Sequence, residues 1–209
     1  MTSKPSLAIL FPSQDADAAA VLGRAFVDDA LIKAILRPTP DTAERTQRMR
    51  RLFAVALASQ RRSGQPVLGV LHEGRVAAAA VIEVAEPSSI SSIVLHGLTL
   101  LPGLAQVGGL GSVKRAIAAL DVLSRNRPPQ PHLYLNVLGV EPELQGRHFG
   151  VALLDWLRDQ TAIRSDLVGV YLETAKEANV AYYSHRGYRV TGEIYPLGVR
   201  MWQMLQPRA

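Results

Sequence analysis

The chain has 209 residues, of which 48% are hydrophobic and 20% are charged. This length is enough for one sizeable core and short for two domains of usual size, so we expect a single domain over residues 1–209. The net charge of +5 fits several anionic partners and selects none of them, while the absence of cysteine excludes disulfides, thiolate metal sites and a cysteine acyl-enzyme.

The first half of the chain predicts alternating strands and helices. Residues 7–11 form a short apolar strand, and apolar residues then recur at helical spacing over 18–26. A second amphipathic helix follows over about 42–62, with its arginines on a solvated face. Two apolar runs, 66–71 and 75–84, are separated by three turn residues and predict an antiparallel hairpin.

The second half begins with residues 87–112, whose Ser, Gly and Leu content gives no clear pattern. The elements expected after it are, in chain order, a helix through 113–120, a break at 126–131, a strand over 133–140, a helix through 151–157, a strand over 168–174, a helix over 179–186 and a last strand over 199–205. This order predicts an α/β fold with one mixed sheet and helices on both of its faces.

The segment Gln145–Gly150 lies between a predicted strand and a predicted helix. The first backbone N–H groups of a helix lack helical partners, and the positive end of its dipole points outward there. Gly146 and Gly150 would let the backbone approach phosphate oxygens closely. The segment lacks the Lys-Ser/Thr pair of a nucleoside-triphosphate loop and the glycine pattern of a dinucleotide site. We therefore predict a pyrophosphate site at residues 145–151.

These residues resemble the GCN5-related N-acetyltransferase superfamily, whose acetyl-CoA loop reads Gln/Arg-x-x-Gly-x-Gly/Ala. Gln145 and Gly150 match this motif, and His148 replaces its middle glycine. Further similarities to the superfamily follow in the chain, namely Leu172-Glu173-Thr174, Asn179, Tyr182-Tyr183 and Gly187-Tyr188. The last 75 or so residues look most like the branch that contains puromycin N-acetyltransferase.

The resemblance implies the GCN5-related acetyltransferase fold, with a mixed, mostly antiparallel central sheet of six to seven strands. It implies an enzyme that transfers the acetyl group of acetyl-CoA to an amine by direct attack in a ternary complex. The five His residues are scattered and form no ligand cluster with acidic residues, so we expect no metal. The expected acceptor is a small molecule, and we expect neither nucleic acid nor a membrane as partner; a homodimer stays open. The apolar runs are too short to span a bilayer and no signal peptide is visible, which favours the cytoplasm.

The resemblance also implies which residues bind the cofactor. The backbone groups of Leu138, Gly139 and Val140 would pair with the pantetheine arm, and Gly139 by itself suggests a bulge or a close approach to the backbone. The other expected contacts are Gln145, Gly146, Arg147, His148, Phe149, Gly150, Val151 and Asn179. His148 could replace the glycine without effect, because His tolerates positive φ better than most residues. Alternatively, its ring could touch a CoA phosphate, or the loop could bind CoA poorly.

Five residues are candidates for catalysis and acceptor binding. Tyr183 would protonate the departing CoA thiolate, the role that the superfamily gives to the second residue of its Phe-Tyr pair. Glu173 is the leading candidate for the general base, with a buried structural glutamate as the alternative, and Asn136 could hold a water molecule. Asp28 and Asp29 could attract a cationic amine, or could belong to a solvated turn.

Two other functions keep the same fold. A protein or peptide N-acetyltransferase would need a shallow, open acceptor groove. A non-catalytic regulatory or nucleic-acid-binding module would bind nucleic acid in a salt-dependent way and would not bind CoA.

Overall fold

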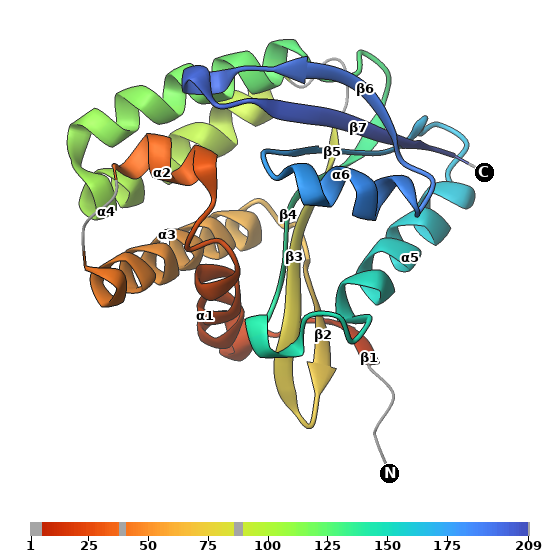
Figure 1. Cartoon of the computed structure of the whole chain (residues 1–209), viewed down its shortest axis with the longest axis horizontal. Helices are drawn as coiled ribbons and strands as arrows, with labels where there is room; N and C mark the ends of the chain where they lie inside the picture. The colour runs from red at the N-terminus through yellow and green to blue at the C-terminus, as the bar shows by residue number, and fades with distance from the viewer. Residues whose placement is uncertain (1–5, 38–40, 86–89, 209) are drawn as a thin grey trace. The chain divides into compact units, whose positions relative to one another are not determined.

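The computed structural model describes residues 6–37, 41–85 and 90–208, with the side chains of 90–100 outside the description. Its seven strands form one mixed sheet in the order β1-β2-β3-β4-β5-β7-β6 (Figure 1), which confirms the expected α/β fold. The strands are β1 (Ser6–Ile9), β2 (Val67–His72), β3 (Arg75–Ala85), β4 (His132–Val140), β5 (Gly169–Thr174), β6 (Arg189–Ile194) and β7 (Met201–Pro207). The helices are α1 (Asp15–Ala25), α2 (Ala30–Leu36), α3 (Thr42–Arg62), α4 (Ile90–Arg125), α5 (Phe149–Ala162) and α6 (Glu177–Ser184), with short 3-10 turns at η1 (Pro12–Gln14), η2 (Pro142–Leu144) and η3 (Pro196–Gly198).

The chain divides into two compact units, each assembled from separate stretches of sequence. The first unit comprises Met1–Val27, Thr39–Ile82 and Asn136–Trp156. The second unit comprises Asp28–Pro38, Glu83–Leu135 and Leu157–Ala209. The single domain expected over residues 1–209 stays a prediction.

In the first unit, β1, β2 and β3 pair antiparallel in sequence order, with Val67 opposite Val81. The turn between β2 and β3 consists of Glu73 and Gly74, whose φ angles are 51° and 76°. Positive φ at both central residues is typical of the type I′ turn, whose twist suits two adjacent antiparallel strands. The predicted hairpin is therefore confirmed.

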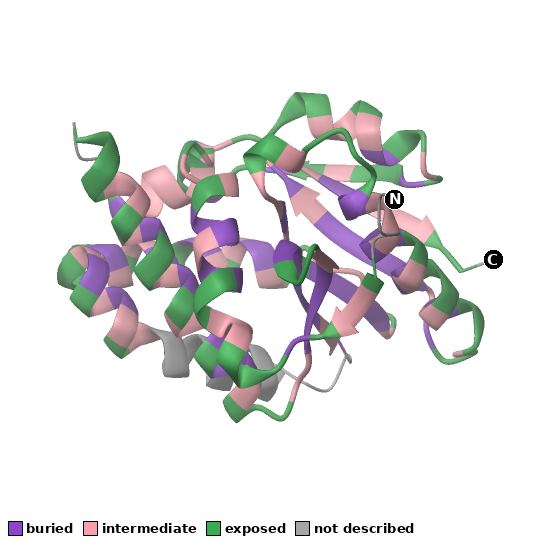
Figure 2. Cartoon of the chain, turned by 90° about the horizontal axis from the view of Figure 1, so that it is seen from below, coloured by how far each residue is buried: buried purple, intermediate pink, exposed green. Residues whose placement is uncertain are grey.

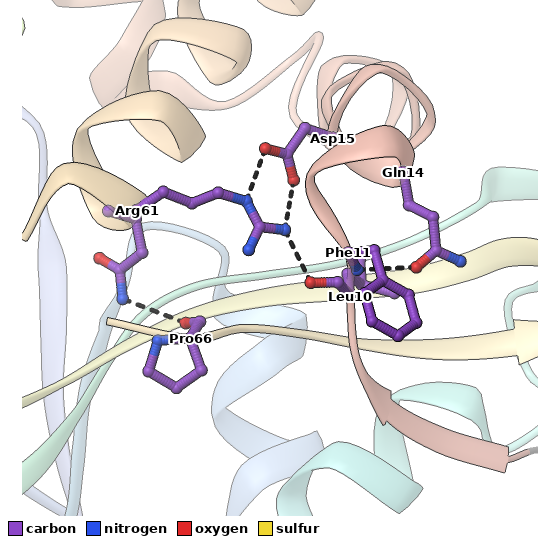
Figure 3. Close-up of polar contacts among 7 residues, drawn as sticks. Leu10, Phe11, Gln14, Asp15, Arg61 and Pro66 are labelled. Atoms are coloured by element: carbon purple, nitrogen blue, oxygen red, sulfur yellow. Dashed lines mark hydrogen bonds and ion pairs between the residues drawn. The ribbon is translucent and has the colours of Figure 1, made fainter. Parts of the chain in front are cut away.

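Helices α1 and α3 pack together in the first unit, and polar side chains connect them to the strands. The Arg61 guanidinium donates to both carboxylate oxygens of Asp15 at 2.6 and 2.7 Å, and to the backbone oxygen of Leu10 at 2.8 Å (Figure 3). Gln60 Nε2 donates to the backbone oxygen of Ile82 at 2.7 Å. These bonds join α3 to the start of α1, to the end of β1 and to β3.

In the second unit, β5 pairs parallel with β4 and antiparallel with β7, and β7 pairs antiparallel with β6. Buried residues lie along the strands (Figure 2), and Val170, Tyr171 and Met204 are at most 1% exposed. Helix α2 packs on α4 through Arg115, whose Nε donates to the backbone oxygen of Ile35 at 2.8 Å. Arg115 thereby satisfies one of the carbonyl groups that the end of a helix leaves unpaired.

Two elements were not predicted from the sequence. Helix α2 falls within 28–40, where seven residues are too few to show a clear period; Asp29 begins it by accepting a hydrogen bond from the Ile32 N–H at 2.8 Å. Strand β6 is mostly exposed and contains a bulge between Val190 and Gly192, so it lacks a regular apolar alternation. Helix α4 is also longer than the expected 113–120, and Gly109, at φ 73° and ψ 174°, interrupts it.

Candidate active site

The predicted phosphate loop lies in the first unit, between the end of β4 and the start of α5. Gly146 and His148 both have positive φ, 80° and 65°, while Arg147 between them does not. Alternation of this kind turns successive backbone N–H groups toward one side, where they form a concave site for an anion. His148 therefore adopts the backbone conformation that a glycine would supply at the middle position of the motif.

Some of the amides of this loop are used within the chain. The Gln145 N–H donates to Pro142 at 3.3 Å, and the Arg147 N–H donates to Leu144 at 3.4 Å. The first helical hydrogen bond at the start of α5 runs from the Ala152 N–H to the His148 oxygen at 3.1 Å. The N–H groups of residues 149–151 precede that bond and have no partner within the helix. The amides at the start of α5 are thus the better candidates for binding an anion.

The side chains of the loop separate into exposed and buried groups. Gly146, Arg147 and His148 are exposed, whereas Phe149 is 4% exposed and packs on His72 with ring centroids 5.1 Å apart. A Cβ atom added to Gly146 would meet no atom within 4 Å. Glycine is therefore favoured at position 146 because of its positive φ, and not because a side chain would clash with neighbouring atoms.

The end of β4 is held by helix α1. A Cβ atom on Gly139 would come within 2.8 Å of Leu22 Cδ2 and 3.0 Å of Ala25 Cβ. The close approach expected at Gly139 is therefore made by α1. The backbone oxygen of Val140 accepts a long hydrogen bond of 3.4 Å from Gln145 Nε2, which ties the motif glutamine to the strand. Pairing of 138–140 with a pantetheine arm stays a prediction, as does a role for Asn136, which is exposed in the middle of β4.

Tyr183 lies on α6 in the second unit and is 9% exposed. Its ring contacts Tyr182 and Tyr188, with centroid distances of 5.3 and 5.4 Å. Burial raises the pKa of the Tyr183 hydroxyl above its usual value near 10, and the neighbouring Tyr182 adds to the increase. The hydroxyl therefore keeps its proton at neutral pH, as a proton donor must.

Asn179 does not cap its helix. It is the third residue of α6, and its Nδ2 donates to Thr174 Oγ1 at 3.2 Å. The same hydroxyl oxygen accepts from the Lys176 N–H at 3.3 Å. Asn179 and Thr174 thus fix the connection between β5 and α6, and a contact of Asn179 with CoA stays a prediction.

Glu173 lies at the end of β5 in a group of polar side chains of the second unit. Tyr171 is two positions before Glu173 on the same strand, Tyr134 is opposite Tyr171 on β4, and Gln203 is opposite Glu173 on β7, so their side chains share one face of the sheet. Arg127 and Glu83 act on the Glu173 carboxyl group through their charges. Burial raises the pKa of the Glu173 carboxyl, against the opposing effects of Arg127 and the two hydroxyls. A carboxylate whose pKa is raised is a stronger base than one with the usual pKa.

Asp28 and Asp29 lie between α1 and α2, as expected, and each has a partner within the chain. Asp28 forms an ion pair of 2.7 Å with Lys33. Asp29 caps α2, and burial raises the pKa of its carboxyl group. Both contacts stabilise the start of α2, while binding of a cationic acceptor by these residues stays a prediction.

The expected site residues fall into two sets. Residues 136–151 belong to the first unit, and Asp28, Asp29, Glu173, Asn179 and Tyr183 belong to the second. Within the described part of the chain, no group of three or more His, Asp or Glu side chains is placed to hold a metal ion. None of the described helices combines the length and the apolar character that crossing a bilayer requires.

Sequence analysis missed four residues around Glu173, namely Arg127, Tyr134, Tyr171 and Gln203. One of them could have been found, because Tyr171 and Glu173 are two positions apart on a predicted strand and so project to the same face. The others come from separate segments, which only strand pairing and loop path bring together. No local pattern in the sequence indicates them.

No protein-family model matches the chain. The fold is nevertheless that of several solved acetyltransferases. A histone acetyltransferase HPA2 and related acetyltransferase from Corynebacterium glutamicum is 20% identical, with 100% of this chain and 98% of that one covered and a TM-score of 0.70. A polyamine N-acetyltransferase from Drosophila melanogaster, which forms N-acetylagmatine, is 17% identical, with coverage of 97% and 98% and a TM-score of 0.53. A GCN5-related N-acetyltransferase from Rhodopseudomonas palustris is 15% identical, with coverage of 99% and 98% and a TM-score of 0.53. The chain thus adopts the fold of the GCN5-related N-acetyltransferases.

Proposed function

We propose that this protein is an N-acetyltransferase that moves the acetyl group of acetyl-CoA to an amine of a small molecule. The observation that carries the proposal is the pair of positive φ angles at Gly146 and His148, directly before α5. This conformation leads the backbone into α5, whose first N–H groups, at residues 149–151, have no partner within the helix and would bind the CoA diphosphate. The sequence motif and the fold support the same conclusion.

The reaction needs one nucleophile, one base and one acid. The amine nitrogen attacks the carbonyl carbon of the acetyl group, the C–N bond forms and the C–S bond breaks. Glu173 takes the proton that the amine loses, directly or through a water molecule. Tyr183 gives its proton to the CoA sulfur, or stabilises the thiolate by hydrogen bonding, and recovers that proton from solvent. The products are the N-acetylated amine and free CoA.

The kind of acceptor is part of the proposal. The Drosophila enzyme with this fold acts on polyamines and forms N-acetylagmatine, which favours a small cationic amine here. The alternative is a protein or peptide amine, which the name of the Corynebacterium protein suggests. The similarity to the puromycin branch stays a prediction, because the acceptor contacts would come largely from the less similar first half of the chain.

The purified protein, incubated with acetyl-CoA and a panel of polyamines, aminonucleosides, aminoglycosides and peptides, tests this function. We expect free thiol to be released with at least one small amine. Release with peptides alone would select the protein acetyltransferase. Binding of nucleic acid together with no calorimetric CoA binding would support the non-catalytic module and reject the proposal.

A further inference from the structure

The polar side chains around Glu173 form a connected group in the second unit. Arg127 Nη1 donates to Glu83 Oε1 at 2.8 Å, and the guanidinium carbon lies 3.7 Å from the centre of the Tyr134 ring. The Arg127 side chain is only 8% exposed. Its charge is therefore poorly screened by water and acts strongly on nearby groups.

Gln203 fixes the direction in which the Tyr171 hydroxyl points. Its Nε2 donates to the backbone oxygen of Asn126 and to the Tyr171 hydroxyl oxygen, both at 2.6 Å. The Asn126 oxygen can only accept, so the amide nitrogen must face it, and its second hydrogen is left for Tyr171. Because the Tyr171 oxygen already accepts this bond, its own hydrogen is left to be donated, and Glu173 is the carboxylate two positions along β5 on the same face of the sheet, opposite Gln203.

The carboxylate at the centre of the group is incompletely paired. Glu173 Oε1 is enclosed and has no hydrogen-bond partner among the described residues. The other ionisable side chains near it are Arg127, Glu83, Tyr134 and Tyr171, with His132 packed behind Tyr171 at 5.3 Å between ring centroids. Burial lowers the pKa of His132, so this ring adds little positive charge near neutral pH. Arg127 is thus the main cation acting on the Glu173 carboxylate.

We propose that Arg127, Tyr171 and Gln203 are positioning residues that hold the Glu173 carboxylate ionised and oriented as the base for the acceptor amine. The inference rests on the proposed function, because it gives Glu173 that role. Arg127 stabilises the ionised form by its charge, and Gln203 aligns the Tyr171 hydroxyl so that it donates to the carboxylate.

The substitution Arg127→Gln tests the electrostatic part. Loss of the positive charge raises the pKa of Glu173, so the acid limb of the pH profile of kcat/KM should move upward by about 1 pH unit. Activity should therefore fall at low pH and recover at higher pH. The matched control is Arg125→Gln, two residues before Arg127. It removes the same charge from an exposed ion pair with Asp121 and should leave the profile unchanged.

The substitution Arg127→Lys keeps the charge and should restore most of the original profile, which a purely structural role would not explain. Tyr171→Phe keeps the shape of the ring and removes only the donor, so it should shift the acid limb in the same direction as Arg127→Gln. Gln203→Leu should shift that limb less than Tyr171→Phe, because the phenol remains but is no longer aligned. Profiles that fall in height without moving along the pH axis would overturn the proposal.

A carboxyl carbon NMR titration of the ligand-free protein separates this inference from the proposed function. Protein labelled at the glutamate carboxyl carbon, with Glu173→Gln to assign the signal, reports the Glu173 titration without any catalysis. We expect the midpoint to rise in Arg127→Gln and Tyr171→Phe. An unchanged midpoint would overturn the positioning network, whereas absence of acetyl transfer by a protein with the expected titration would reject only the enzyme function.

Discussion

Arg24 and Glu141 form a bidentate ion pair that fixes the start of the predicted phosphate loop to helix α1. Arg24 Nε donates to Glu141 Oε1 and Nη2 donates to Oε2, both at 2.6 Å. The Glu141 N–H also donates to the backbone oxygen of Ala77 on β3 at 2.8 Å. Glu141 is therefore held on both sides at the point where β4 ends and the loop begins.

The first prediction concerns this ion pair. Glu141→Gln should weaken CoA binding several-fold, because the loop would no longer be held in the conformation that presents its amides. Isothermal titration calorimetry measures the effect. Lys33→Gln, which removes an ion pair near α2 instead, serves as the control and should leave CoA affinity unchanged. Equal affinities for Glu141→Gln and the unmodified protein would show that the pair does not position the loop.

The second prediction separates backbone conformation from side-chain contact at His148. His148→Gly should keep CoA affinity within about threefold, because glycine adopts positive φ without strain. His148→Val should weaken affinity or stability markedly, because a β-branched residue at φ 65° is strained. A large loss of affinity in His148→Gly would instead mean that the imidazole itself contacts the ligand.

The third prediction concerns the proposed acid. Tyr183→Phe should lower kcat by more than about tenfold with nearly unchanged CoA affinity, because only the proton donor is lost. Tyr182→Phe removes a hydroxyl from the adjacent residue and should keep most of the activity. Since burial raises the pKa of Tyr183, its loss of a proton should lower activity only above pH 10. A Tyr183→Phe protein as fast as the unmodified one would exclude Tyr183 as the acid.

The fourth prediction concerns stability and uses the contacts of Arg61. Arg61→Leu removes three hydrogen bonds to Asp15 and Leu10, two of them to a half-buried carboxylate, and should lower the free energy of unfolding by about 1–3 kcal/mol. Urea unfolding followed by circular dichroism measures the change. Arg48→Gln breaks only an i,i+4 pair with Glu44 and should cost less than about 0.5 kcal/mol. Similar losses in both variants would mean that the Arg61 contacts add nothing specific.

The strands that were predicted correctly are those whose apolar residues are also buried in the structure. The hairpin of β2 and β3 and the strand β5 are largely buried apolar runs between turn residues, so the sequence indicates them directly. Strand β6 was not predicted, because it is a mostly exposed edge strand. Its main-chain hydrogen bonds with β7 do not require a pattern of hydrophobic side chains.

The sequence by itself indicated the loop from Gln145 to Gly150 and its resemblance to the acetyltransferases, because a motif of consecutive residues is local. Binding of a phosphate by this loop stays a prediction. The sequence also predicted that position 148 tolerates positive φ. Only the tertiary structure assigned the surroundings of Glu173, because Arg127, Tyr134 and Gln203 are far from it in the chain. Strand pairing brings Tyr134 and Gln203 near it, and the loop before β4 brings Arg127. The pKa of a buried carboxyl depends on those neighbours, and no local pattern specifies them.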